Sequence, residues 1–246
     1  DHDDGPKSFL GETGRFNGED IIAIICRQPA TARFISRHLY HFFVADEPPV
    51  SKWPYEEPQD MEAIRTLEKA YFDGNHNISD MLRVLFNSEF FKSEDCHYKK
   101  IKSPAELVTG VLRITEEFGS PRIGLPERNS HISYMGQQLL NPPSVEGWHQ
   151  GLEWIETGSI MQRINFASRH LGEASNPGVK KIVQNILGNE EKHLSAESCI
   201  DRCLDELGAV EASEYIRDTL IAFADETGLP EMDLSTDRAM AEEKLS

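Results

Sequence analysis

The sequence contains no long apolar run. Its longest purely apolar stretches are residues 21–26 and 42–45, and a helix needs about 20 apolar residues to cross a bilayer. We therefore expect no transmembrane segment and a soluble chain. The chain begins at Asp1, without a leader-like series of basic, apolar and small residues, so this end does not indicate a compartment.

Cysteine is also scarce. The chain has four cysteines in 246 residues: Cys26, Cys96, Cys199 and Cys203. They are too few for a disulfide scaffold and show no C-x-x-C spacing. We expect ordinary reduced thiols, and a zinc site built from all four cysteines remains the alternative.

Basic residues are fewer than acidic residues. The chain carries 25 Lys and Arg against 42 Asp and Glu, a formal net charge of −17. Such a field repels phosphate backbones and anionic lipids, which excludes nucleic acid as a partner. Hydrophobic residues still make up 39% of the chain, enough for a packed core.

Several catalytic signatures are missing. The sequence has no G-x-S-x-G elbow, no G-x-x-x-x-G-K-[ST] phosphate loop, no G-x-G-x-x-G and no H-E-x-x-H. It also lacks an alternating apolar and polar run of useful length, so any sheet is minor.

The remaining pattern is helical. We predict an all-α fold, an irregular multi-helix array with long loops containing Pro, Gly and Trp and at most a minor hairpin. The expected helices cover residues 17–27, 30–44, 61–72, 78–91, 103–114, 130–140, 159–171, 179–187, 195–207 and 212–226, and residues 234–246 form an acidic partial helix.

Composition changes near residues 172–177. Beyond this point the helices are shorter, more charged and poorer in aromatic residues. We predict a main helical domain over residues 1–171 and a smaller acidic helical subdomain or extension over residues 172–246.

The N-terminal segment is one candidate site. His2, Asp3 and Asp4 offer an imidazole and carboxylates, donors that suit a divalent metal cofactor. Lys7 follows and can bind an anion or pair with one of these acids. The alternative is a hydrated acidic loop without a metal.

A second candidate lies in residues 141–157. Two prolines follow Asn141, and the loop presents Trp148 and His149 before ending near Trp154. A rigid loop of this kind can serve as a ligand platform on which an indole stacks on a sugar or another flat group. The alternative is a tryptophan plug that seals the neighbouring helices.

His38 and His41 form a third candidate because they are neighbours on one helix turn. His38 falls between Phe34 and Phe42 on an apolar stripe that we expect to be buried. We favour a core histidine bonded to a carbonyl beside a surface histidine, over a pair that holds one ion.

Several blocks resemble a known family, the bacterial domain-of-unknown-function 1800 family. The blocks are His2-Asp3 with Lys7, residues 9–11 and 13–14, QPATARFI at 28–35, KSPAELV at 102–108, MGQ at 135–137, NPPSVEGW at 141–148 and RINFA at 163–167. The resemblance covers residues 1–171, and the Pro, Gly and Trp block is its most specific part.

The resemblance implies a C-terminal portion of a longer family domain, without an established activity. Genes of this family often lie beside those of a sulfatase-like family, and many members are exported. These associations suggest export and a sulfatase-like protein or a polysaccharide as partner.

Two functions remain open from the sequence. The first is an accessory or binding module for a partner protein or an extracellular polymer. The second is a metal-assisted hydrolase in which His2, Asp3 and Asp4 hold the ion. There, Lys7 would stabilise negative charge and His38 or His149 would act as base.

Overall fold

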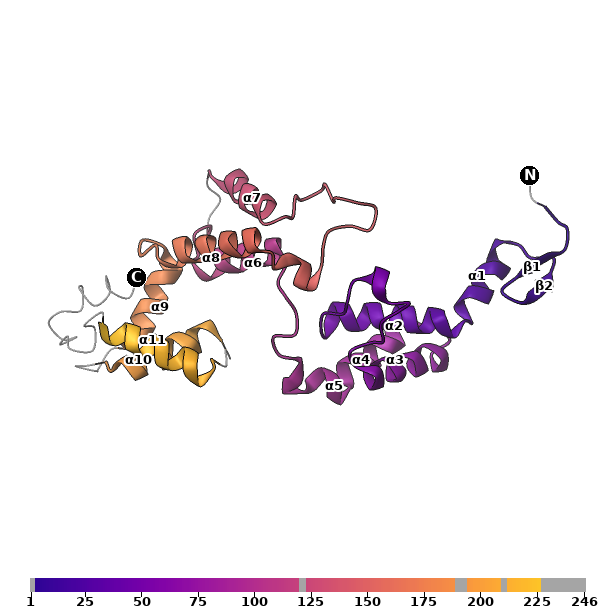
Figure 1. Cartoon of the computed structure of the whole chain (residues 1–246), viewed down its shortest axis with the longest axis horizontal. Coiled ribbons are helices and arrows are strands. Elements are labelled where there is room, and N and C mark those ends of the chain that lie inside the picture. Colours follow the sequence, from indigo (N-terminus) through magenta and orange to yellow (C-terminus); the bar gives the residue numbers. More distant parts are fainter. Residues whose placement is uncertain (1–2, 120–122, 189–193, 209–211, 227–246) are drawn as a thin grey trace. The chain divides into compact units, whose positions relative to one another are not determined.

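The computed structural model describes residues 3–119, 123–188, 194–208 and 212–226. Across these residues the secondary structure is helical apart from one short antiparallel hairpin and an isolated bridge (Figure 1). The predicted all-α fold with a minor hairpin is therefore confirmed. The chain folds into two compact units, Asp1–Lys102 with His149–Trp154, and Ser103–Trp148 with Ile155–Ser246.

The first unit begins with the hairpin. Strands β1 (Lys7–Phe9) and β2 (Glu12–Gly14) pair antiparallel, with Ser8 opposite Thr13. The helical elements of this unit are α1 (Gly18–Cys26), α2 (Pro29–Phe43), η1 (Val50–Lys52), α3 (Met61–Asp73), α4 (Ile78–Asn87), α5 (Glu89–Lys92), η2 (Glu94–Cys96) and η3 (Gly151–Trp154).

Local chemistry sets the helix ends in this unit. Asn17 caps α1 in a reciprocal capping box with Asp20. The single helix predicted over residues 78–91 is wrong. Ser88 has an extended backbone, ends α4 and caps α5 by accepting a hydrogen bond from the Phe91 amide.

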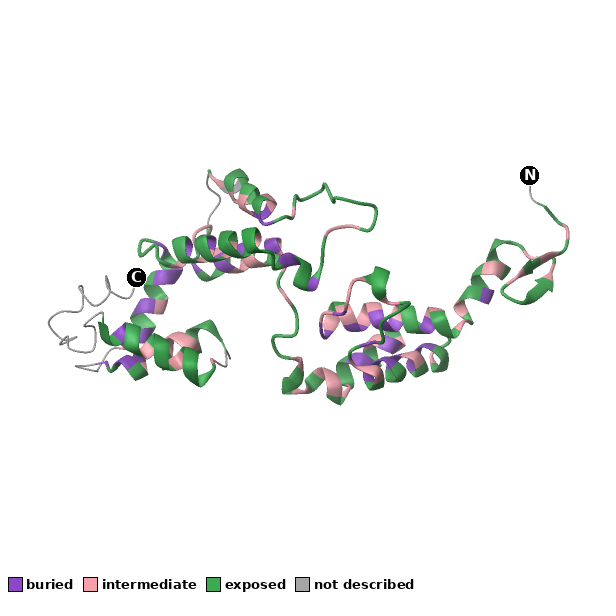
Figure 2. Cartoon of the chain, viewed as in Figure 1, coloured by how far each residue is buried: buried purple, intermediate pink, exposed green. Residues whose placement is uncertain are grey.

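The core of the first unit lies between α2, α3 and α4. Ile64, Leu67, Met81 and Leu85 are completely buried there, and Tyr40 brings α2 into the same cluster. Figure 2 shows buried residues on the facing sides of these helices. This packing fixes α2, which carries most of the polar side chains described below.

The second unit is wholly helical in its described residues, apart from the isolated bridge. Its elements are α6 (Pro104–Ile114), α7 (Leu125–Tyr134), α8 (Thr157–Leu171), α9 (Pro177–Leu187), α10 (Ala196–Leu207) and α11 (Glu214–Glu226). Ser103 and Glu106 form a capping box at the start of α6. The cores are formed by α6, α7 and α8, by α9 with α10, and by α10 with α11.

The helix predicted over residues 130–140 is misplaced, because α7 begins at Leu125 and ends at Tyr134. Gly124, at φ +115°, precedes the helix, and Pro126 lies in its first turn, where a missing N–H costs nothing. Gly136, at φ +99°, follows the C-terminus. As a result the helix begins five residues and ends six residues earlier than predicted.

A close backbone contact joins α6 to α9. The Gly178 amide donates to the Thr115 carbonyl at 3.0 Å, and a Cβ at position 178 would lie 2.0 Å from the Ile114 oxygen. Only glycine fits there. The contact links residues on either side of the predicted boundary at 171/172, and that boundary remains a prediction.

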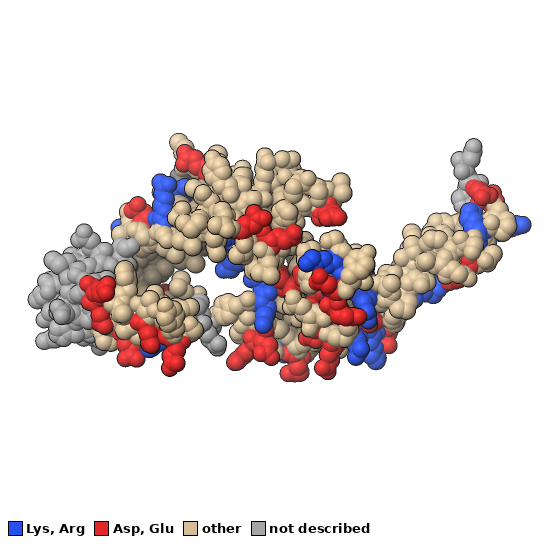
Figure 3. Space-filling view, in the orientation of Figure 1, with Lys and Arg blue, Asp and Glu red and all other residues tan. Residues whose placement is uncertain are grey.

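None of the helices in the described ranges is long and apolar enough to cross a membrane. On the face drawn in Figure 3, acidic side chains are spread over both units. The Lys and Arg side chains on this face stand between them in small groups.

Replacing Gly178 with Ala should destabilise the protein, because the added methyl group must push α9 away from the α6 carbonyl. Overpacking of this kind costs about 1–3 kcal/mol. Gly158→Ala is the matched control, since its Cβ would meet nothing within 4 Å and should stabilise by about 0.4–1 kcal/mol. Urea unfolding monitored by circular dichroism measures both values, and equal effects would contradict the close contact.

Candidate functional site

The N-terminal candidate residues form a local turn. The Asp3 carboxylate accepts a hydrogen bond from the Gly5 amide at 2.8 Å, and the Lys7 ammonium donates to the Asp3 carbonyl. Asp3 and Asp4 are exposed, whereas His2 lies outside the described residues. Among the described residues, no three His, Cys, Asp or Glu side chains gather into a metal-binding group. The divalent metal site remains a prediction.

The Trp148 loop is held by its own polar groups. The Trp148 indole N–H donates to the Gln138 carbonyl at 3.0 Å, and the Asn141 amide donates to the Gln138 side chain at 2.9 Å. A single antiparallel bridge pairs Ser144 with Gly147. Trp148 is half-buried and Asn141 is exposed. The indole therefore closes a ring of chain at residues 138–148.

His149 and Trp154 belong to the first unit, whereas Trp148 belongs to the second. The exposed His149 imidazole lies 3.4 Å from the Glu153 carboxylate. Trp154 is only 4% exposed, which gives its indole a packing role in this structure.

The predicted buried stripe on α2 is wrong. Phe34 is 47% and Phe42 is 69% exposed, while Arg37 is 2% exposed. The buried face of α2 runs through Ala32, Ser36, Arg37 and Tyr40. This helix therefore buries a charged residue, one position away from the apolar stripe that periodicity suggests.

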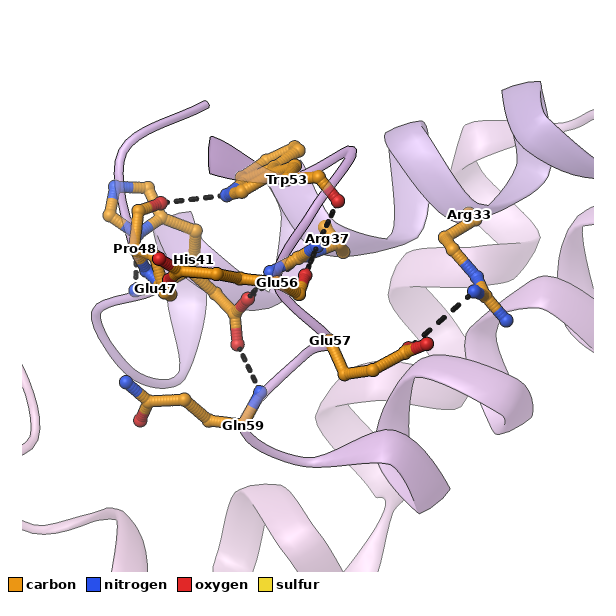
Figure 4. A network of polar contacts seen from close by, with 9 residues as sticks. All are labelled: Arg33, Arg37, His41, Glu47, Pro48, Trp53, Glu56, Glu57 and Gln59. Atoms are coloured by element: carbon orange, nitrogen blue, oxygen red, sulfur yellow. Dashed lines mark hydrogen bonds and ion pairs between the residues drawn. The ribbon is translucent and has the colours of Figure 1, made fainter. Parts of the chain in front are cut away.

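Arg37 forms a buried ion pair with Glu47 (Figure 4). Two guanidinium nitrogens donate to one Glu47 oxygen, at 3.0 and 2.6 Å, and a third donates to the Trp53 and Glu56 carbonyls at 3.3 and 2.9 Å. The second Glu47 oxygen accepts from the Gln59 amide at 3.0 Å. This Arg37–Glu47 clamp satisfies the buried charges and ties residues 47–59 to α2.

Aromatic rings cover the clamp. The Arg37 guanidinium lies 4.7 Å from the Trp53 ring centre, a cation–π contact. His38 packs between Phe34 and Trp53, with ring centres 4.4 and 4.6 Å away. The half-buried position of His38 lowers its pKa, and the nearby His41 lowers it further. His38 is thus part of an aromatic cluster.

His41 is partly exposed, and both of its ring nitrogens have hydrogen-bond partners. Its Nδ1 accepts a hydrogen bond from the Glu47 amide at 2.9 Å, which leaves the proton of the neutral ring on Nε2. Nε2 then donates to the Gln150 side-chain oxygen. His41 therefore positions the backbone at Glu47 and links α2 to the segment before η3.

A second buried polar cluster occurs in the second unit. Glu117 lies 2.5 Å from the Arg128 guanidinium and 2.7 Å from His170 Nδ1. Burial raises the pKa of Glu117, but Arg128 and His170 outweigh it and lower that pKa. Burial also lowers the pKa of His170, and the Glu117 charge only partly opposes this effect. The cluster is a carboxylate that contacts both the Arg128 guanidinium and the His170 imidazole.

The geometry of these clusters is that of structural ion pairs. Arg37 and Glu47 are paired with each other and hydrogen-bonded to the backbone, so neither side chain is free to bind a reacting group. No short motif predicts Arg37, because an arginine on an amphipathic helix normally faces solvent. The only feature of the sequence that points to the pair is Glu47, an acidic residue ten positions after Arg37 and next to Pro48 at the start of a loop.

These features define an all-α protein with two polar groups, the Arg37–Glu47 clamp and the Glu117–Arg128–His170 cluster, and with an exposed, internally braced loop. The chain matches the family model described as "Protein of unknown function (DUF1800)" over residues 1–237. It therefore belongs to this family, and the match extends beyond the 171 residues in which we found the resemblance. No curated protein and no solved structure is significantly similar to the chain.

Replacing Glu47 with Gln should lower the free energy of unfolding by about 3–5 kcal/mol, because Arg37 would keep a buried, uncompensated charge. The control is Glu12→Gln, which removes an exposed ion pair with Arg27 at 2.9 Å and should cost less than about 1 kcal/mol. Chemical denaturation measures both. Similar losses in the two variants would contradict a buried clamp.

Acidification should destabilise the protein through His170. Its pKa is lowered by folding, so the unfolded chain binds the proton more readily, and stability falls as the pH drops below about 6.5. His170→Asn keeps a donor near Nδ1 and should flatten the dependence of stability on pH between about 7.5 and 5.5. The exposed His97→Asn is the control. An unchanged slope in His170→Asn would show that His170 does not contribute.

Proposed function

We propose that this chain is a non-catalytic helical module that binds a partner protein through residues 137–148, here called the Trp148 loop. The observation that carries the proposal is the exposed position and left-handed backbone of Leu140. Its side chain is 96% exposed, and its backbone lies at φ +63°. A bulky residue in the left-handed region is a true outlier, and such strain concentrates at functional positions.

The Trp148 loop displays further apolar surface. Val145 is fully exposed and Leu139 is 42% exposed. The loop carries a single charged residue, Glu146, in a chain of strongly acidic composition. An exposed apolar segment with so little charge is the usual surface of a protein interface.

The loop is braced before any partner arrives. The Gln137 side chain accepts from the Ala105 amide at 2.8 Å, which anchors the loop to the first turn of α6. The bond from Trp148 to the Gln138 carbonyl closes its other end, and two consecutive prolines stiffen the middle. Pre-organisation of this kind reduces the entropy lost on binding.

The chemistry of the loop favours a protein over a polysaccharide. Leu and Val side chains offer no hydrogen bonds to sugar hydroxyls, and the indole N–H of Trp148 is already used within the loop. An apolar groove on a protein surface matches these side chains better. A polysaccharide partner is retained as an outcome of the test.

The decisive variant is Leu140→Asn with Val145→Asn. Asparagine tolerates the left-handed region, so the double variant should keep or raise the melting temperature while the capture of the partner falls at least tenfold. Capture is measured by affinity purification from extracts of the source cells, with photo-crosslinking from position 140. Leu152→Asn, at an apolar position 79% exposed in the first unit, is the control and should leave capture unchanged.

Two results would contradict the proposal. The first is a partner recovered equally by the wild type and the double variant. The second is retention on an insoluble polysaccharide that survives protease treatment of the extract and disappears in the double variant, which would assign the loop to a polymer.

A further inference from the structure

A pocket opens in the first unit between α1 and the turn that joins α3 to α4. Its volume is about 480 Å³, which lies within the range of small-molecule sites. Its walls include Glu19, Ile22, Ala23 and Arg27 on or beside α1, and Asn75 and His76 in the turn. The pocket is separate from the Arg37–Glu47 clamp and from the Trp148 loop.

Tyr71 holds both walls of the pocket in place. Its phenol O–H donates to the Cys26 carbonyl, at the end of α1, at 3.0 Å. Its own carbonyl accepts from the His76 amide at 2.7 Å, and the two rings pack with their centres 4.8 Å apart. Tyr71 itself belongs to the buried core of α2, α3 and α4. The pocket is therefore formed before a ligand arrives, which reduces the entropy lost on binding.

The turn carries polar side chains on a left-handed backbone. Asn75 lies at φ +50° and His76 at φ +68°, whereas Gly74, in the same turn, has φ −84°. Glycine takes the left-handed region at the lowest cost, yet here two side chains with hydrogen-bonding groups occupy it. Neither side chain makes a hydrogen bond to another residue in the described part of the chain. Both groups line the pocket.

The two ends of the α1 wall differ in charge. At one end, Arg27 Nη2 donates to both Glu12 oxygens at 2.9 and 3.1 Å, and the other guanidinium nitrogens make no hydrogen bond to the described residues. At the other end, Glu19 forms no ion pair within the described ranges. Residues 19 and 27 are eight positions apart, which is about 12 Å along a helix axis. The apolar Ile22 and Ala23 lie between them.

This distribution of charge favours a zwitterion. A ligand with only a negative charge would meet an Arg27 already balanced by Glu12, and would also face the unbalanced Glu19. A ligand with only a positive charge would leave the Arg27 and Asn75 donors unused. The ammonium and carboxylate of a free amino acid share one carbon atom, whereas three extended residues of a peptide span about 10 Å. A short peptide therefore matches both ends of the wall.

We propose that this pocket binds a short zwitterionic peptide of about three residues. Its ammonium group pairs with Glu19, and its carboxylate accepts hydrogen bonds from Arg27 and Asn75. An apolar side chain in the middle of the peptide packs on Ile22 and Ala23. Binding is non-covalent and does not depend on the Trp148 loop.

The test is isothermal titration calorimetry of the full chain with the tripeptide Ala-Leu-Ala. We expect saturable binding of one peptide per chain. The N-acetylated and the C-amidated tripeptides each lack one charge, and each should bind about fivefold more weakly, as expected for the loss of a solvent-exposed ion pair. Free leucine, which cannot reach both ends, should bind more weakly than either.

Variants of the pocket locate the two contacts. Glu19→Gln should weaken binding of the free tripeptide about fivefold but should not weaken binding of the N-acetylated peptide further, because both changes remove the same contact. Asn75→Gly suits the left-handed backbone and should weaken binding of the free tripeptide without lowering the melting temperature. Glu62→Gln is the control, because Glu62 is an exposed glutamate in the first turn of α3, outside the pocket.

Four results would overturn the proposal. The first is no saturable binding of Ala-Leu-Ala to the folded wild type. The second is equal affinity for the free and the N-acetylated tripeptide. The third is a loss in Glu62→Gln as large as that in Glu19→Gln, which would show a general effect of charge. The fourth is Glu19→Gln weakening the free and the N-acetylated tripeptide by the same factor.

Discussion

The buried pair of Arg37 and Glu47 is the constraint on which the first unit depends. Residues 47–59 form little regular structure of their own apart from η1, and their main anchor to α2 is one guanidinium that binds a carboxylate and two backbone carbonyls. A buried pair of this type adds little net stability compared with apolar residues, but its directional hydrogen bonds hold the groups that they join in place. In this unit it sets the path of a loop and the position of Trp53.

The sequence predicts the helical scaffold well because the relevant interactions are local. The capping boxes at Asn17 and Ser103 are readable as spacings of three residues, and the structure forms both. The errors arise where a single residue changes the backbone. Ser88 divides a continuous apolar pattern into two helices, and Gly124 starts α7 earlier than its hydrophobic pattern indicates.

The polar sites are less predictable because they depend on tertiary contacts. Arg37 has the same local neighbourhood as a surface arginine, and only its distant partner makes burial possible. Trp148 and Trp154 look equivalent in the sequence, yet one braces an exposed loop while the other is buried.

The ring of chain closed by Trp148 has a consequence for the lifetime of any complex it forms. In the proposed complex a partner that contacts only the few apolar side chains exposed on this loop would bury far less area than a permanent assembly does, and contacts of this size belong to transient encounters. Because the loop is already ordered, association does not wait for a slow rearrangement, and release requires none either. In the proposed role, a braced loop of this size would suit rapid exchange between partners rather than permanent assembly.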